Sequence, residues 1–284
     1  MATANPRLLV GHTGITWRAE VIEDGIKCIA SLGYNTIEIF AWTLKALKYA
    51  GRGDLFQKYN IPPNSSYYLL DIVDPAVRDA VMAKLEDWTD VVVSVGGKYA
   101  TFGGNAVPRR QFKFDEHKKY IVDFVNEAGK RLQAKGMKLN FHPHTGTPVE
   151  TAAEIRPFLD AIDTKVVGFA PDIGQIQKGG ADPLAITKDY ISILGLVHFK
   201  DYSGSVKFDD EGREIDTSGF TCYAPLGKGV VDLEGYMDYI EGTSFNGPVM
   251  VELDGGRDMP MSAEEAVTIN RDYMAKLGYA FVKR

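Results

Sequence analysis

Cysteines, basic clusters and long apolar runs are scarce or missing in this chain of 284 residues. Cys28 and Cys222 lie far apart, and the N-terminal segment lacks the basic region and apolar stretch of a secretory signal, so we expect a protein of the reducing cytoplasm. No apolar run approaches the roughly 18 residues needed to cross a bilayer, so we expect no membrane insertion. The formal net charge is −6, and we therefore expect no binding to nucleic acid.

Linkers are also missing, because no stretch is rich in proline, glycine or serine and no repeat finer than one strand and one helix occurs. The chain is long enough, and with 45% hydrophobic residues apolar enough, to form one large core. We therefore expect a single domain that spans residues 1–284.

Short apolar runs alternate with longer amphipathic segments along the whole chain. This pattern is typical of parallel strands joined by crossover helices. Eight such pairs predict an α/β fold, a (β/α)8 TIM barrel. We expect its strands at residues 8–12, 36–40, 64–68, 99–103, 138–142, 166–172, 194–201 and 249–253.

Helix and loop signals lie between the expected strands. Residues 116–135 place apolar side chains on one stripe that ends before a glycine, and Asp74 followed by proline is typical of a helix start. Two long connections, residues 41–63 and 202–231, follow the C-terminal ends of strands, where a barrel builds its active site. Within the second, the polar residues 203–220 form either a lid or a surface excursion.

Side chains alternate in direction along a strand, so the apolar residues identify which neighbours face the barrel axis. In residues 138–142, Leu139 and Phe141 should face the helices. His142 then points inward, and His144 follows in the same phase just past the strand.

The later strands add further inward polar residues by the same rule. His198 and Lys200 alternate with apolar residues, Glu252 follows an alternating apolar pair, and Asp172 stands at the end of its strand. Two imidazoles and two carboxylates, those of His142, Asp172, His198 and Glu252, are thus expected at one mouth of the barrel.

These four residues form a candidate site for a divalent metal ion. Each one alone could be satisfied by a hydrogen-bonded neighbour, but several carboxylates in a barrel mouth are costly to bury without a shared cation. Mixed histidine and carboxylate ligands suit Mn²⁺, Fe²⁺, Co²⁺ or Zn²⁺, and they fit Mg²⁺ less well. We favour Mn²⁺.

An ordered series of motifs carries a family resemblance across nearly the whole chain. The motifs are Ile37-Glu38, His142-Pro143-His144, Pro171-Asp172-Ile173-Gly174-Gln175, Val197-His198-Phe199-Lys200-Asp201, Pro225-Leu226-Gly227-Lys228-Gly229 and Val251-Glu252. The series resembles the sugar phosphate isomerase/epimerase superfamily, which has a xylose isomerase-like TIM barrel, and is closest to its inosose dehydratase and keto-sugar lyase branch.

The resemblance also implies an activity. The metal in that superfamily is typically held by Glu, Asp, His and Glu, and the aligned residues here begin with His142, which departs from the pattern. A histidine there, followed by His144, resembles inosose dehydratase and related keto-sugar lyases. The resemblance therefore implies a metal-dependent lyase for a keto-cyclitol or keto-sugar, acting by inosose dehydration or by elimination from a 3-keto-glycoside.

Two other functions remain open at this point. One is a metal-dependent sugar isomerase or epimerase that interconverts keto-sugars. The other is a subunit of a hetero-oligomeric complex that cleaves C-glycosides, since relatives of that kind are built from unlike subunits. In each case the expected partner is a small carbohydrate or cyclitol, and self-association of the barrel is expected as well.

Four residues are candidates for moving or holding protons. His144 is the first choice for the base, because an imidazole titrates near neutral pH, and Glu38 and Glu252 are its rivals. Lys200 is expected to donate to the charge that develops on the substrate oxygen. The alternative for Lys200 is an ion pair with Asp201 or Glu252.

Six further residues are candidates for contacting the substrate. His12 and Trp17 could line a wall against a sugar ring, with barrel packing as the alternative. Gln175, where relatives often have histidine, could hydrogen-bond the substrate or a metal-bound water. Arg257 and the pair Arg109 and Arg110 could bind substrate oxygens or simply form a solvated rim.

Overall fold

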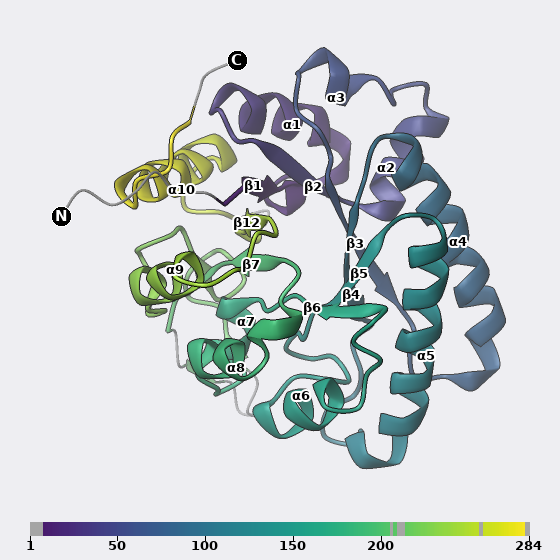
Figure 1. Ribbon diagram of the computed structural model, residues 1–284. Helices are drawn as coiled ribbons and strands as arrows, with labels where there is room; N and C mark the ends of the chain where they lie inside the picture. Colours follow the sequence, from purple (N-terminus) through teal and green to yellow (C-terminus); the bar gives the residue numbers. More distant parts are fainter. Residues whose placement is uncertain (1–7, 205–206, 209–213, 256–257, 282–284) are drawn as a thin grey trace.

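The computed structural model describes residues 8–204, 207–208, 214–255 and 258–281. Its central feature is a parallel sheet of eight strands that curls into a barrel with helices outside it (Figure 1). Neighbouring strands follow the order β6-β5-β4-β3-β2-β1-β12-β7. Their bounds are β1 Val10–Thr13, β2 Thr36–Phe40, β3 Ser65–Leu70, β4 Tyr99–Gly104, β5 Lys138–Phe141, β6 Val167–Phe169, β7 Val197–Phe199 and β12 Val249–Val251.

The barrel closes between β6 and β7 through two isolated parallel bridges. Phe169 pairs with Leu194, and Asp172 pairs with His198. The backbone N–H of His198 donates to the carbonyl of Pro171 over 2.9 Å. This closure places Asp172 beside His198 at the C-terminal ends of the strands, where barrel enzymes carry their sites.

The predicted fold class is confirmed, and each expected strand is present. The largest differences are at residues 166–172 and 194–201, of which only Val167–Phe169 (β6) and Val197–Phe199 (β7) form strands of the sheet. Proline lacks the N–H that a strand ladder requires, so Pro171 ends the first of these strands. Asp172 then caps the helix that follows.

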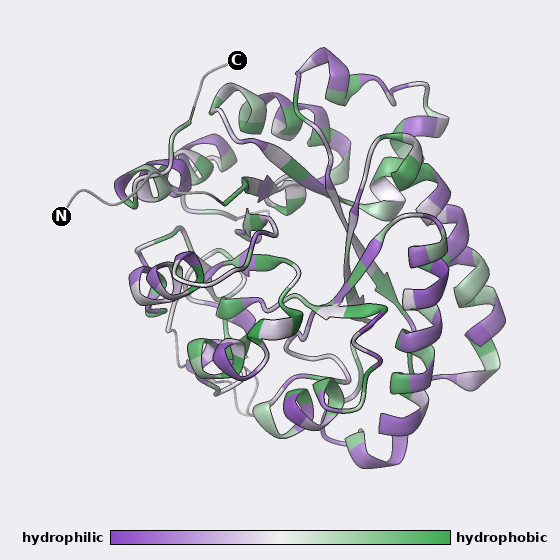
Figure 2. Cartoon of the chain, viewed as in Figure 1, coloured by the Kyte–Doolittle hydropathy of each residue, from purple (hydrophilic) through white to green (hydrophobic). Residues whose placement is uncertain are grey.

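Helices cover the outside of the barrel, and Figure 2 shows polar residues along the outer side of α4 and α5. None of the helices in the described ranges is both long and apolar enough to span a membrane. The α-helices are α1 Ile22–Ser31, α2 Ala41–Tyr49, α3 Leu55–Lys58, α4 Arg78–Ser94, α5 Phe114–Ala134, α6 Ala152–Leu159, α7 Ile173–Lys178, α8 Pro183–Asp189, α9 Leu233–Glu241 and α10 Ala263–Lys276. Short 3-10 helices span Gly14–Thr16, Ala19–Val21, Pro75–Val77 and Ile191–Ile193.

The helix signals of the sequence are placed nearly as predicted. Helix α5 buries the predicted apolar stripe and ends before Gly136, whose φ of 79° suits glycine because it lies in the left-handed region. The carboxylate of Asp74 accepts a hydrogen bond from the N–H of Ala76 over 2.8 Å and caps the short 3-10 turn that leads into α4.

The long connection after β7 carries two small antiparallel pairs. Strand β8 Asp201–Tyr202 pairs with β11 Tyr223–Ala224, and β9 Lys207–Phe208 pairs with β10 Glu214–Ile215. Residues 205–206 and 209–213 fall outside the described ranges. Whether residues 203–220 act as a lid therefore stays a prediction.

Candidate metal centre and substrate pocket

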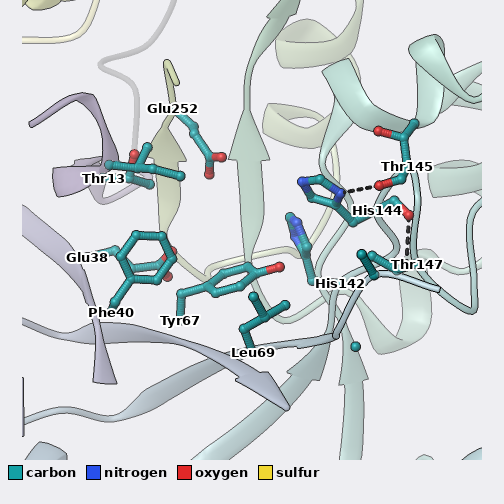
Figure 3. A pocket seen from close by; sticks show the side chains of 13 residues that line it. Thr13, Glu38, Phe40, Tyr67, Leu69, His142, His144, Thr145, Thr147 and Glu252 are labelled. Carbon is teal, nitrogen blue, oxygen red and sulfur yellow. Dashed lines mark hydrogen bonds between the residues drawn. The ribbon is translucent and has the colours of Figure 1, made fainter. Parts of the chain in front are cut away.

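The alternation along β5 and β7 directs apolar and polar side chains to opposite sides. Phe141 packs on Phe158 of α6 with ring centroids 4.1 Å apart, whereas the next residue, His142, lines a pocket in the barrel mouth (Figure 3). Phe199 contacts α9 in the same way, and its neighbour His198 is buried among carboxylates. The inward directions of these two histidines are as predicted.

His198 lies between two glutamates. Its Nε2 is 2.8 Å from Oε1 of Glu38, and its Nδ1 is 2.5 Å from Oε2 of Glu252. Neither ring nitrogen has a partner in hydrogen-bond geometry, so both carboxylates lie off the directions of the ring N–H bonds. Burial lowers the pKa of His198, but the two carboxylates outweigh burial and raise it well above its ordinary value. The other oxygen of Glu38 accepts hydrogen bonds from the hydroxyls of Ser65 and Thr101.

Lys200 is fully buried in a cluster of carboxylates. Its Nζ is 2.8 Å from Oε1 of Glu252, 2.9 Å from Oδ1 of Asp254 and 3.7 Å from Oδ2 of Asp172. It also lies 4.0 Å from the centroid of the Tyr223 ring. Burial lowers the pKa of Lys200, but the three carboxylates outweigh burial and raise it well above its ordinary value, so the side chain is an ammonium ion.

Of the two alternative ion pairs for Lys200, the structure contains the one with Glu252. The carboxylate of Asp201 instead accepts hydrogen bonds from the backbone N–H groups of Gly227, Gly229 and Val231 over 3.0, 2.8 and 3.1 Å. Residues 227–231 therefore form a turn whose backbone N–H groups bind the Asp201 carboxylate.

Asp172 uses its two carboxylate oxygens differently. Oδ1 accepts a hydrogen bond from the backbone N–H of Gln175 over 2.9 Å and caps α7. Oδ2 is buried without a hydrogen-bond partner. Burial raises the pKa of Asp172 to about 7, against the opposing effect of Lys200.

Two groups of side chains, which share His198, bring potential ligand atoms within 4.8 Å of one another. One group contains His142, Asp172 and His198, and the other contains Glu38, His198 and Glu252. The four predicted ligands are thus divided between two adjacent groups. Glu38, which the sequence predicts only as a rival base, also lies at ligand distance.

The chemistry of these side chains fits a divalent cation. Both ring nitrogens of His142 and Oδ2 of Asp172 are buried with no hydrogen-bond partner, which is costly unless something else binds them. The cluster also has an excess of negative charge. Four carboxylates, those of Glu38, Asp172, Glu252 and Asp254, share the Lys200 ammonium and at most one imidazolium, so two negative charges are uncompensated when all four carboxylates are ionised.

His144 is a neutral imidazole with both nitrogens engaged. Nδ1 lies 2.7 Å from the carbonyl of Thr145 and must donate to it, so Nε2 is the acceptor and lies 2.7 Å from the Gln175 amide nitrogen. The amide oxygen of Gln175 accepts from the N–H and hydroxyl of Thr145, which fixes the orientation of the amide. Burial and the Lys200 ammonium lower the pKa of His144 to about 4.

The loop that carries His144 is held by Arg109. The guanidinium lies 2.8 Å from Glu150 and 2.6 Å from Glu154, and it donates to the carbonyl of Thr147 over 3.0 Å. Glu150 in turn accepts from the backbone N–H of Gly146 over 2.8 Å. Arg109 thus helps to position this loop through its ion pairs.

A pocket of about 210 Å³ opens beside the charged cluster (Figure 3). Its lining brings together ligand candidates and the predicted base. The polar side chains that line it include those of Thr13, Glu38, His142, His144, Thr145 and Glu252. Lys200, Asp172, His198 and Gln175 do not line this pocket and lie behind its wall.

Two predicted substrate contacts lie away from this pocket. His12 is buried with its Nε2 3.1 Å from the Asn270 amide nitrogen of α10 and its ring edge-on to Tyr34. Trp17 packs over Gly25 of α1, where an added Cβ would lie 2.7 Å from the indole. A third predicted contact, Arg257, lies outside the described residues.

Sequence analysis missed several residues of this site. Phe40, Tyr67 and Leu69 line the pocket. The alternation of side-chain direction along a strand could have identified Phe40 and Tyr67. Phe40 follows the inward Glu38 by two positions, and Tyr67 follows the inward Ser65 by two. Asp254 follows Glu252 in the same phase.

Comparisons with known proteins agree with this fold. The family model described as xylose isomerase-like TIM barrel matches residues 26–277. The inosose dehydratase of Geobacillus kaustophilus is 26% identical over 310 residues, which cover 99% of this chain and 96% of the relative. Inosose dehydratase 2 of Bacillus cereus is 28% identical over 169 residues. That alignment covers 58% of this chain, and the chain spans only 56% of that relative's length.

Solved structures resemble the chain over most of its length. The probable 3-DHS dehydratase of Bacillus anthracis aligns with a TM-score of 0.76 and 15% identity, covering 94% of this chain and 98% of the other. The IOLI protein, whose crystal structure contains a bound zinc atom, aligns with a TM-score of 0.75 and 17% identity over 98% and 100% of the two chains. At these identities the structures establish the shared fold. The chain therefore belongs to the xylose isomerase-like TIM barrel family, and the predicted inosose dehydratase branch is confirmed by its relatives.

Proposed function

We propose that this chain is a metal-dependent lyase that acts on a keto-cyclitol or keto-sugar. The observation that carries the proposal is the composition of the pocket wall, which contains His142, Glu38 and Glu252 together with the neutral imidazole of His144. Beside this wall lie buried potential metal-ligand atoms that have no hydrogen-bond partner. The similarity to inosose dehydratases supports the class of reaction.

The metal would be held by His142, Asp172, His198 and Glu252, with Glu38 within reach of the same cluster. A divalent cation at this place would supply a Lewis acid that polarises the substrate carbonyl. Mn²⁺ is the ion that we propose, in an enzyme of the cytoplasm whose residues 1–284 form one domain and self-associate.

His144 is the proposed base. Its neutral Nε2 removes the proton from the carbon next to the ketone, once the Gln175 amide gives up its hydrogen bond to that nitrogen. The electron pair of the C–H bond forms the new C=C bond, and the neighbouring C–O bond breaks. The departing oxygen takes its proton back from the His144 imidazolium and leaves as water or as an alcohol.

Lys200 has a positioning role in this proposal rather than direct contact with the substrate. Its ammonium lies behind the pocket wall and holds Glu252 and Asp172. By compensating part of the negative charge, it keeps several buried carboxylates ionised at a short distance from one another.

A second function is favoured by one observation. Glu38 and Glu252 contact opposite nitrogens of the His198 ring, so two carboxylates frame the site. An isomerase or epimerase could use such a pair to remove a proton on one face of a keto-sugar and return it on the other. That reaction would exchange a substrate hydrogen without losing a group.

The two functions differ in what happens in D₂O. We would incubate the Mn²⁺-loaded protein with scyllo-inosose and with a 3-keto-glucoside, and follow both by NMR and mass spectrometry. The lyase predicts loss of water or aglycone, and His144→Gln should slow it by about 10²- to 10⁴-fold, while the control His117→Asn, on α5 outside the pocket, should not. Deuterium uptake or a stereoisomer without elimination would replace the lyase by the isomerase. No reaction without an added second protein would favour the hetero-oligomeric complex.

A further inference from the structure

The pocket has an apolar half. Ile15 follows β1, Phe40 and Leu69 lie at the ends of β2 and β3, and Ala106 follows β4, and all four line the pocket. The histidines His142 and His144, by contrast, come from the end of β5. Figure 3 shows Phe40 and Leu69 on the side of the pocket away from His144 and Thr145.

These apolar side chains are not part of the hydrophobic core. Ile15, Phe40 and Leu69 are only half-buried, and they belong to none of the three clusters of packed apolar residues among the described residues. Apolar surface left open to water costs about 25 cal/mol per Å². Such surface inside a pocket therefore favours a ligand that covers it.

The apolar wall is also held in place from behind. Phe40 stacks on Trp42 with ring centroids 4.2 Å apart, and it meets the edge of Tyr67 at 5.6 Å. Tyr67 in turn lies edge-on to His142 at 5.2 Å. A wall fixed in this way loses little side-chain entropy when a ligand binds.

The wall adjoins the loop of the proposed base. The backbone N–H of Val107, the residue after Ala106, donates to the carbonyl of Gly146 over 2.9 Å. Gly146 lies in the same loop as His144. A substrate that spans the pocket would therefore place an apolar group on this wall and its sugar ring beside His144.

A free cyclitol complements such a wall only in part. The C–H bonds of one ring face could cover part of it, but oxygen substituents surround the ring edge, and a polar group buried against aliphatic side chains without a partner costs about 1–3 kcal/mol. We propose that the physiological substrate is a keto-glycoside with an apolar, aromatic leaving group that lies on Ile15, Phe40 and Leu69.

The reaction on that substrate balances without a further reagent, and the assignment rests on the proposed lyase. His144 takes the proton from the carbon next to the ketone, a C=C bond forms, and the bond from the anomeric carbon to the aglycone oxygen breaks. The aglycone leaves as a phenol with the proton that His144 returns. An unsaturated keto-sugar remains.

The test compares phenyl 3-keto-glucoside, methyl 3-keto-glucoside and scyllo-inosose on the metal-loaded protein. The proposal predicts that kcat/KM for the phenyl compound exceeds that for each of the others by at least about tenfold. Because phenol is intrinsically a better leaving group than methanol, the wall is tested by the change in the phenyl-to-methyl ratio, which Leu69→Asn and Ile15→Asn should lower by about tenfold; an unchanged ratio in both variants would overturn the proposal. Val93→Asn, a matched change on the outer side of α4, should leave the ratio unchanged. Equal rates with phenyl and methyl compounds, or a preference for scyllo-inosose, would overturn the proposal.

A binding measurement tests the aromatic subsite independently of the proposed lyase activity. If no compound undergoes elimination, the lyase fails, and the wall is tested by calorimetric titration of the same three compounds into the protein. Binding of the phenyl compound at least about tenfold more tightly than the others, lost in Leu69→Asn, would still support the aromatic subsite. Equal affinities would overturn it.

Discussion

The side-chain amide of Gln175 donates a hydrogen bond over 2.7 Å to Nε2 of His144, the nitrogen that we propose as the base. The opposite nitrogen is fixed as a donor by the carbonyl of Thr145. Gln175 therefore selects the tautomer in which Nε2 keeps its lone pair. In this structure Gln175 acts on His144 and does not line the pocket itself.

Replacing the Gln175 amide by a carboxylate should favour a protonated Nε2 on His144 in place of the lone pair. In Gln175→Glu a carboxylate oxygen faces Nε2, so the ring should take up a proton and the pKa of His144 should rise above about 4. The shift can be followed by the ¹⁵N NMR signals of the imidazole as a function of pH. Gln177→Glu, two positions along the same helix, is the matched control. An unchanged His144 titration in Gln175→Glu would contradict the assigned hydrogen bond.

Metal binding should depend on Asp172 through its charge. Asp172→Asn keeps a side chain that can cap α7 but removes the ionised ligand, so metal affinity should fall by more than about 100-fold while the barrel stays folded. Metal content and circular dichroism would be measured together. Asp182→Asn, at the matching cap of α8, should keep full metal content. Unchanged stoichiometry in Asp172→Asn would remove Asp172 from the site.

Lys200 should be essential for stability when no metal is bound. Lys200→Met leaves Glu252, Asp254 and Asp172 without their common cation, and removing one partner of a buried ion pair typically costs about 3–5 kcal/mol of unfolding free energy. Urea unfolding of metal-free protein measures the loss. Lys45→Met breaks a partly exposed pair with Asp87 and should cost less than about 1 kcal/mol. Equal costs for the two variants would contradict the charge balance that we describe.

The buried His12 should make stability depend on pH. Burial lowers the pKa of His12 to about 4, whereas the unfolded chain titrates near 6.5. Between these values only the unfolded chain binds the proton, so this contribution is complete above pH 6.5 and is lost as the pH falls to about 4. The total is about 3 kcal/mol.

The contribution is isolated by comparing wild type with His12→Gln. The difference between their unfolding free energies should shrink by about 3 kcal/mol between pH 7 and pH 4, because the variant lacks this titration. Urea unfolding at several pH values measures it. Parallel pH profiles would show that His12 takes up its proton in the folded barrel.

The strands and their inward-facing residues could be predicted from the sequence, because side chains alternate in direction along a strand and the apolar residues mark the side that faces the helices. Leu139 and Phe141 fix the direction of His142, and Val197 and Phe199 fix that of His198. The same rule, applied to Val10, places His12 with the residues that face the helices, and the structure has this arrangement.

Other parts of the site depend on contacts that no local pattern determines. Gln175 in α7 reaches His144 only because of the conformation of the loop after β5, and Lys200 meets Asp254 across neighbouring strand ends. Phe40 is apolar and the sequence pattern assigns it only to the strand, although its position two residues after Glu38 turns it into the pocket. Such residues are recognised only when the ends of several strands are seen together.

The central claim is that elimination requires both the metal centre and His144. The most direct measurement adds Mn²⁺ to chelator-treated protein in the presence of a 3-keto-glucoside and records the released aglycone over time. The account predicts no release before the addition, release after it, and a rate at least about 100-fold lower in His144→Gln with equal metal content. Release at the same rate in the presence of chelator, or full activity of His144→Gln, would contradict it.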